Sequence, residues 1–340
     1  MKLSLVDASI LPYQGDRKQA LKNTIETAQV VEGLGFQRIW LAEHHKPKLV
    51  VSRAPEVLIP AIAENTKHIR VGSGGILLNH YSPYKVAENF ATLCELYSGR
   101  IDLGIGRATT GEHSDFALQH DRSAIRQTDN SNSMEQLTEL LAWFTNDFPK
   151  NHPFSNVEVY NDGTLPNVFL LGQSTWSAEA SAQLGLGYAF AGFFNQQTAL
   201  ETTQLYKQNF QPSDKNHTQK EPYLILGLTV FAHETDELAL EFSAPMQNWV
   251  NQFRINGMLS DQLLPEKEAL ESIKDSIIMQ RMVNPTQLPL YIVGKAETVA
   301  QELKAIQTVF SADEIILRIM SANQKSKLKS LELLTKHLLD

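Results

Sequence analysis

The feature that most restricts the fold of this chain is a repeated alternation of short apolar runs with longer amphipathic runs. A short apolar run is typical of a buried strand, and apolar residues recurring every three to four positions are typical of a helix. The expected strands are 2–6, 36–42, 69–78, 101–105, 168–171, 188–191, 223–232, 290–293 and 314–319. Strand–helix units repeated in this way form parallel sheets through right-handed crossovers. About seven or eight such units predict a closed barrel or a large open sheet.

The amphipathic runs predict helices that separate most of these strands. They are expected at 18–34, 54–64, 83–97, 131–145, 174–184, 196–210 and 297–306, with a last helix ending near 339. Two stretches, 107–165 and 234–289, break the alternation, and we interpret both as insertions. A length of 340 residues suits two average domains, but α/β barrels often exceed ~250 residues as one domain. No stretch has the composition of a linker, so we expect a single domain over 1–340.

Charge and cysteine content exclude several classes of protein. The chain has 30 Lys and Arg against 38 Asp and Glu, and the net charge of −8 argues against binding to nucleic acid or anionic membranes. A single positive pocket for a small anion remains compatible with that balance. The one cysteine, Cys94, excludes a disulfide framework and a cysteine-based zinc site. No apolar run approaches ~20 residues and no signal peptide is recognisable, so we expect a cytoplasmic protein without a membrane span.

Two adjacent histidines follow the second expected strand, in the segment AEHHK at 42–46. Residues at the C-terminal ends of the strands form the active site in α/β barrels. His44 and His45 would point to opposite sides of an extended strand, so we expect no metal shared between them. One of them is a candidate for proton transfer near neutral pH. The alternative is a histidine that makes only structural hydrogen bonds.

Glycines interrupt the third expected strand, in the segment GSGGI at 72–76. Glycine weakens a strand interior, so a cluster of three requires a physical reason. A flat ligand close to the bare backbone is one reason, and an unusual peptide geometry is another. A plain bulge is the third alternative.

Arg107 follows the fourth expected strand, within GIGRATTG at 104–111. The segment is not a dinucleotide fingerprint, because Thr109 replaces the third glycine, and not a phosphate-binding P-loop, because Glu112 replaces the lysine. An arginine with small hydroxyl neighbours at a strand end suits an anion such as a phosphate. A structural ion pair of Arg107 with a carboxylate is the alternative.

A helix N-terminus rich in small residues follows the fifth expected strand, in GQSTWS at 172–177. Trp176 stands where a nucleophile elbow requires glycine, so this segment is not a hydrolase motif. Free backbone N–H groups and the helix dipole would favour a phosphate there. Plain N-capping by Ser174 is the alternative. The proximity of Arg107 one strand earlier strengthens the phosphate interpretation.

Together these segments resemble the bacterial luciferase-like flavin monooxygenase superfamily. The resemblance rests on AEHH at 42–45, RVGSGGILL at 70–78, SGRIDLGIGR at 98–107, GQS at 172–174 and VGKAETVA at 293–300. It covers nearly the whole chain. The resemblance implies a (β/α)8 barrel with insertions at its mouth. It also implies an enzyme that uses reduced FMN, supplied by a separate reductase, and molecular oxygen to oxidise a small organic substrate.

The family's functional residues can be carried onto this chain position by position. Arg107, Ser174 and Ser177 would hold the flavin phosphate, with help from the backbone N–H of Gln173. The Gly74–Gly75 bond corresponds to a non-prolyl cis peptide under the flavin ring. His44 matches a histidine at the mouth, a candidate acid/base or a stabiliser of the oxygenated flavin.

The resemblance also carries departures and alternatives. Gly106 replaces the reactive cysteine of the luciferase α-subunit, and Arg126 is only a poorly aligned substitute for that subunit's second phosphate-binding arginine. Deazaflavin-dependent hydride-transfer enzymes share the barrel, and a non-catalytic flavin-binding protein is a further alternative. In relatives, 234–289 corresponds to a mobile lid that would exclude water. Relatives are often homodimers, which this sequence neither confirms nor excludes.

Large aromatic residues within the two insertions leave the substrate undefined. Trp143, Trp249 and Phe253 either line a hydrophobic pocket or belong to the core, and we expect two of the three in the core. Cys94 is expected to pack on the third helix without taking part in the chemistry.

Overall fold

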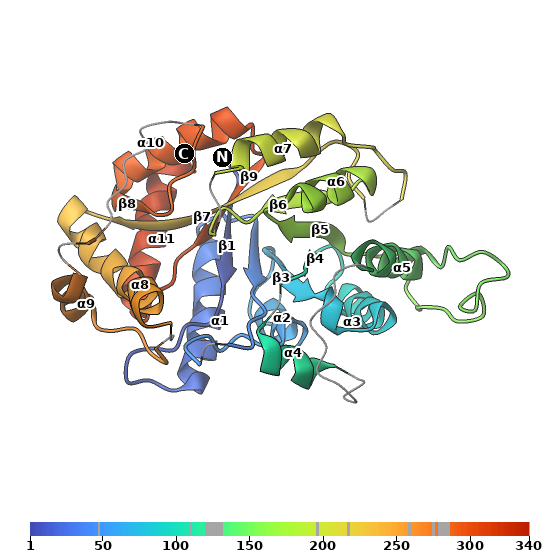
Figure 1. Ribbon diagram of the computed structural model, residues 1–340, viewed down its shortest axis with the longest axis horizontal. Coiled ribbons are helices and arrows are strands. Elements are labelled where there is room, and N and C mark those ends of the chain that lie inside the picture. The colour runs from blue at the N-terminus through green and yellow to red at the C-terminus, as the bar shows by residue number, and fades with distance from the viewer. Residues whose placement is uncertain are drawn as a thin grey trace.

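Eight parallel strands close into a barrel in the described residues of the chain, for which we used a computed structural model (Figure 1). The barrel strands are β1 (Leu3–Asp7), β2 (Arg38–Leu41), β3 (Arg70–Leu77), β4 (Ile101–Gly106), β5 (Asn167–Gly172), β6 (Gly187–Phe190), β7 (Leu224–His233) and β9 (Glu314–Arg318). Neighbours pair in the order β1 to β7, and β9 closes the ring by pairing with both β7 and β1. The predicted (β/α)8 barrel is therefore confirmed.

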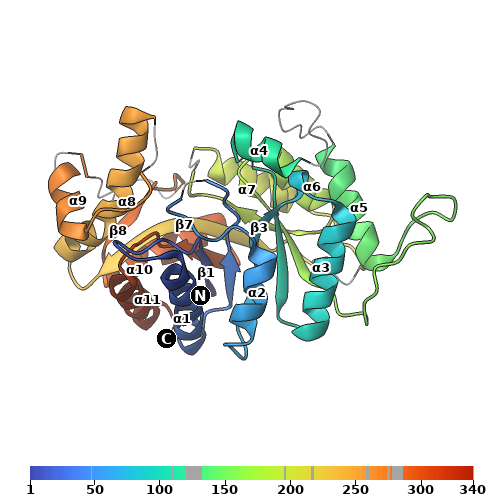
Figure 2. The same cartoon turned by 90° about the horizontal axis from the view of Figure 1, so that it is seen from below.

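The structure describes residues 1–46, 48–108, 110–119, 132–194, 197–215, 218–257, 260–273, 276–277 and 286–339. Its helices are α1 (Arg17–Gly33), α2 (Pro55–Ala63), α3 (Pro83–Leu96), α4 (Glu112–Leu118), α5 (Ser133–Thr145), α6 (Thr175–Gln183), α7 (Ala199–Gln208), α8 (Asp236–Asn256), α9 (Glu266–Ile273), α10 (Ala296–Phe310) and α11 (Gln324–Leu338). Figure 2 shows the chain termini on the side opposite α4, which follows the C-terminal end of β4. The side that carries α4 is therefore the mouth of the barrel.

One predicted strand lies outside the barrel. The run predicted at 290–293 forms β8 (Ile292–Lys295), which pairs with Val230–His233, the second half of the long strand β7. The first half of β7 pairs with β6 and β9 inside the barrel. Helices α8 and α9, from the stretch at 234–289, pack against each other beside this outer strand pair (Figures 1 and 2).

The floor of the barrel holds a buried network of charges. Arg38 donates to Asp102 at 2.7 Å and to both carboxylate oxygens of Glu314 at 2.8 and 3.0 Å. Asp102 also accepts from Trp40 Nε1 at 3.0 Å and from Arg70 at 2.8 Å. Burial by itself would lower the pKa of Arg38, but Asp102 and Glu314 raise it, so the guanidinium is charged. Every charge of this network has a partner of opposite sign.

Above this network an apolar layer fills the barrel. Trp40, Phe169, Ala189, Ile225 and Ile316 pack together there, and Trp40 and Phe169 form an edge-on ring contact at 5.1 Å. The interior is thus a packed core up to the level of the mouth.

The helices outside the barrel bury a larger core, which includes residues the sequence left open. Cys94 on α3 is buried in this core, and burial raises the pKa of its thiol to about 12, in agreement with a packing role. Trp143 on α5 is buried, Trp249 is partly buried against the core, and Phe253 is 47% exposed. Among the described residues, no helix combines the length and apolar character needed to cross a membrane.

Candidate functional site

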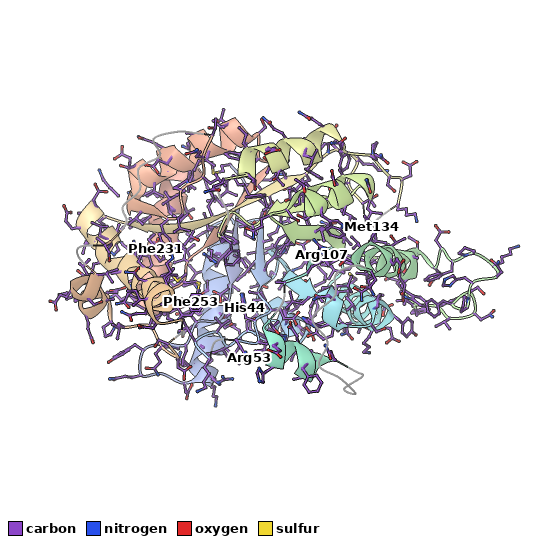
Figure 3. All side chains as sticks on the ribbon, viewed as in Figure 1. His44, Arg53, Arg107, Met134, Phe231 and Phe253 are labelled. Atoms are coloured by element: carbon purple, nitrogen blue, oxygen red, sulfur yellow. The ribbon has the colours of Figure 1, made fainter. Side chains whose placement is uncertain are left out.

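His44 lies just beyond the end of β2, at the mouth of the barrel. Its Nδ1 atom is buried and has no hydrogen-bond partner among the described residues. Burial lowers the pKa of His44 to about 4, and electrostatic interactions with Arg318, His45 and Arg53 lower it as well. His44 is therefore neutral at pH 7. Figure 3 shows it between Arg107, on the side of α5, and Phe253, on the side of α8.

The neighbouring His45 has a different role from His44. Its Nε2 atom lies 2.8 Å from Glu43, which also accepts hydrogen bonds from the Tyr81 hydroxyl at 2.6 Å and the Leu77 backbone N–H at 2.9 Å. Burial raises the pKa of Tyr81, and Glu43 raises it further. This cluster fixes the segment after β2 to the end of β3. His45 therefore makes structural hydrogen bonds, whereas His44 has a ring nitrogen without a partner among the described residues.

The glycine segment of β3 contains a cis peptide bond between Gly74 and Gly75, as the resemblance implied. The register with β4 shifts between Gly74 and Ile76, so the segment is also a bulge. A Cβ atom on Gly74 would lie 2.9 Å from Trp40 Cβ, and one on Gly75 would lie 2.6 Å from the Gly104 carbonyl oxygen. The unusual peptide geometry and the bulge raised by the sequence are thus both present, and close packing of Gly74 against β2 and of Gly75 against β4 explains why glycine is required.

Arg107 lies just after β4, and its guanidinium stacks 3.4 Å from the centre of the Trp176 ring. Nη1 lies 3.5 Å from the Ser133 hydroxyl, and burial lowers the pKa of Arg107. Among the described residues, no carboxylate forms an ion pair with Arg107, so the structural ion pair that the sequence left open finds no support in them. A cavity of about 10 Å³, lined in part by Asn79 and Leu137, adjoins this arginine.

The segment after β5 brings some of the predicted phosphate ligands to the mouth and withdraws one. Ser174 is exposed and caps α6 by accepting from the Ser177 N–H at 3.3 Å. Ser177 is buried, and its hydroxyl donates to the Ser174 carbonyl at 2.7 Å. A Cβ on Gly172 would lie 2.5 Å from that hydroxyl. Ser177 thus stabilises the turn between β5 and α6.

Four strand ends in succession carry polar groups toward the same part of the mouth. Among the described residues, buried atoms without a hydrogen-bond partner include His44 Nδ1 after β2, Asn79 Oδ1 after β3 and Gln173 Oε1 after β5. Arg107 lies between the last two, after β4. Strands β2 to β5 are consecutive neighbours in the barrel, so these groups form one continuous row. Buried polar atoms normally have partners, so the groups of this row are candidates for contact with a polar ligand.

Sequence reasoning missed Arg318, the last residue of β9, and Asn79. Each of these two residues lies at or just after the C-terminal end of a barrel strand, which is the criterion that identified Arg107. Neither lies in a glycine-rich or histidine-rich segment, so the sequence contained no second signal for them. The proposed substitute arginine, Arg126, lies outside the described residues.

Comparisons with known proteins identify the family of the chain. Residues 1–311 match the family described as luciferase-like monooxygenase. Protein YwcH of Bacillus subtilis, which is uncharacterised, is 35% identical over 98% of this chain and 98% of its own. An N-acetyl-S-alkylcysteine monooxygenase of Bacillus subtilis is 32% identical over 98% of this chain and 97% of its own. The crystal structure of apo-MsnO8 is 34% identical, with a TM-score of 0.87 over 99% of this chain and 98% of that chain.

More distant structures share the fold alone. The oxygenating constituent of 3,6-diketocamphane monooxygenase from Pseudomonas putida, in complex with FMN, has a TM-score of 0.71 at 18% identity, over 99% of this chain and 97% of that chain. The coenzyme F420-dependent tetrahydromethanopterin reductase of Methanopyrus kandleri has a TM-score of 0.67 at 12% identity, over 99% and 98%. The barrel is therefore common to proteins that use either cofactor.

Proposed function

The chain belongs to the luciferase-like monooxygenase family, and from this premise we propose that it uses reduced FMN and molecular oxygen to oxidise a small organic substrate. The observation that carries the proposal is the row of polar groups on the ends of β2 to β5. The row contains Arg107, which has no carboxylate partner in the part of the chain that the structure describes, and His44, which is neutral at pH 7.

The residues of the row divide into two ends with different chemistry. At the β4–β5 end, Arg107 and the N-terminus of α6 would hold the flavin phosphate, because a guanidinium and free backbone N–H groups both favour a dianion. The backbone N–H of Gln173 and the exposed Ser174 hydroxyl would add donors there. Ser177 would contribute by fixing the turn, since its hydroxyl already bonds to Ser174.

At the β2–β3 end, the Gly74–Gly75 segment would lie against the flavin ring, and His44 would face the reacting groups. Reduced FMN, when bound, supplies the two electrons needed to activate oxygen. His44 is neutral at pH 7, so its free Nδ1 can hold or accept a proton. Proton transfer at that atom is the role we assign to it.

The proposal is tested with the purified full-length chain, a flavin reductase and an oxygen electrode. We expect FMN to bind, and oxygen uptake to increase when a substrate is added. N-acetyl-S-methylcysteine is the first probe, because a relative at 32% identity is named for that class of thioether. Tighter binding of coenzyme F420 than of FMN would replace the proposal with hydride transfer. FMN binding without turnover on any compound of a broad panel would indicate a non-catalytic flavin protein.

A further inference from the structure

Arg318 faces the inside of the barrel at the level of the mouth. It stands two residues after Ile316, which belongs to the apolar layer, and alternate residues of a strand share a face. Its partners in the barrel register are Val6 on β1 and Thr229 on β7. A methyl group of Val6 lies 3.2 Å from the Cβ position of Gly74. Strands β1 and β2 separate Arg318 from the cis peptide in the barrel, and Arg318 lies beyond the His44 end of the polar row.

The guanidinium of Arg318 is held along one side only. Nε and Nη2 donate to the Thr229 hydroxyl at 3.1 and 2.9 Å, and Nη2 approaches the Phe193 carbonyl at 3.4 Å. The rings of Phe193 and Phe194 lie 4.5 and 5.1 Å from the guanidinium carbon. Among the described residues, none accepts a hydrogen bond from Nη1. One donor group is thus positioned and unused.

The charge of Arg318 has no compensation from the part of the chain that the structure describes. Burial lowers the pKa of Arg318 to about 10, and the nearby Tyr291 opposes that effect, so the side chain remains charged at pH 7. No carboxylate forms an ion pair with it among those residues. The groups that act on the adjacent His44 are Arg318, His45 and Arg53, which contribute positive charge. A buried charge is costly unless an opposite charge accompanies it.

We infer that Arg318 binds a carboxylate of the substrate, so that the proposed monooxygenase acts on small organic acids. This inference rests on the proposed function and specifies its substrate class. A carboxylate accepts the paired donors of a guanidinium better than any neutral group does. With the acid group fixed at Arg318, the remainder of a small substrate would extend toward His44 and Gly74. The second source of such an anion is the reduced flavin itself, and the experiment separates the two.

The test compares acids with their uncharged amides on FMN-free protein. The probe pairs are phenylacetate with phenylacetamide, and N-acetyl-S-benzylcysteine with its amide, titrated by calorimetry at pH 7. We expect the wild-type chain to prefer at least one acid over its amide by about 10- to 100-fold, the effect of a hydrogen-bonded ion pair. Arg318→Gln should abolish the preference, and Arg318→Lys should retain part of it. Arg254→Gln is the matched control, because it removes the same charge from an exposed position on α8.

A second readout distinguishes anion binding from a purely structural role. In the wild-type chain, an acid bound at Arg318 should raise the pKa of His44, followed by NMR of its ring. In Arg318→Gln, the pKa of His44 should be higher without a probe and unchanged by the acid. Equal affinity for acids and amides in the wild-type chain overturns the inference.

The result also separates this inference from the function on which it depends. If FMN binds and oxygen is consumed but acids show no advantage, the inference fails and the proposed function stands. If Arg318→Gln weakens FMN binding more than 10-fold without any acid preference in the wild-type chain, the anion belongs to the flavin and the inference fails. If the wild-type chain binds neither flavin nor deazaflavin, the proposed function fails.

Discussion

Both the floor and the mouth of the barrel carry arginines, but within the described residues those of the floor have carboxylate partners and those of the mouth have none. Arg38 at the floor contacts Asp102 and Glu314, and all three side chains are buried. At the mouth, Arg107 stacks on Trp176 and Arg318 on two phenylalanines, without an ion pair in the described part of the chain. The floor satisfies its charges internally, which stabilises the fold. We propose that the arginines of the mouth instead meet the negative charge of a ligand, so that one barrel combines rigidity with binding.

The largest expected effect is a loss of stability when the buried charge network at the floor is disrupted. Asp102→Ala would leave Arg38 and Arg70 without their shared carboxylate, and removing one partner of a buried pair costs about 3–5 kcal/mol. Urea denaturation should show this loss in the free energy of unfolding. Arg318→Gln, at the mouth, should change it by less than about 1 kcal/mol, because no carboxylate loses a partner. Similar losses in the free energy of unfolding for Asp102→Ala and Arg318→Gln would show that the arginines of the floor and of the mouth do not differ in their contribution to stability.

Removal of the mouth histidine should affect turnover and leave flavin binding intact. General acid–base catalysis contributes roughly 100-fold or more, so we expect His44→Ala to slow substrate oxidation by about that factor. Its affinity for FMN should stay within about two-fold of the wild-type value, because the phosphate end of the row is unchanged. Stopped-flow oxidation and FMN titration measure the two quantities. Full activity in this variant would exclude His44 from the mechanism.

A substitution at the phosphate end of the row should have a smaller effect, which is on the affinity for FMN. Arg107→Ala should weaken FMN binding by about 1.5–3 kcal/mol, the range for a hydrogen bond to a charged group. Riboflavin has no phosphate and serves as the matched ligand, with an affinity that should be nearly the same in both proteins. Fluorescence titration measures both constants. An equal loss for FMN and riboflavin would place Arg107 against another part of the cofactor.

The smallest expected effect is a pH dependence of stability that originates at the mouth. The pKa of His44 is about 4 in the folded chain and about 6.5 when unfolded. Between these values the unfolded chain binds the proton and the folded chain does not, so stability falls as the pH drops from about 6.5 toward 4. Between pH 7 and pH 5, the Tm of the wild-type chain should fall about 2–3 °C more than that of His44→Asn. Parallel Tm profiles would show that His44 is not desolvated.

The sequence predicted the strands better than their pairing. All nine apolar runs form strands, because burial on both faces leaves a local signature in composition. The position of β8 outside the barrel has no such signature, because the segments that form β7 and β8 are both apolar runs. Only tertiary contacts decide which strands close the ring. The short helix α4 was also missed, because its sequence lacks a clear apolar stripe.

The candidate site was predicted where residue types cluster and missed where a single residue matters. His44, Arg107 and the glycine pair stand in unusual segments, and the structure brings all of them to the mouth. Ser177 was predicted to hold the phosphate, which stays a prediction, and the donation of its hydroxyl to the Ser174 carbonyl is a direction that no spacing argument contains. Arg318 follows an ordinary apolar strand, and its significance depends on the absence of a carboxylate among neighbours from other strands.

Strand β7 belongs to two sheets, and the change occurs between two consecutive residues. Thr229 is the last to pair with β9 and holds Arg318, whereas Val230 is the first to pair with β8. A planar peptide links them, so their orientations are coupled. Substitutions that change the packing of α8 against β7 and β8 are therefore expected to shift Thr229, and with it the guanidinium of Arg318, through the peptide bond between Thr229 and Val230. A change at the periphery of the barrel is therefore expected to move a hydrogen-bond donor at its mouth, although the two lie on different sheets.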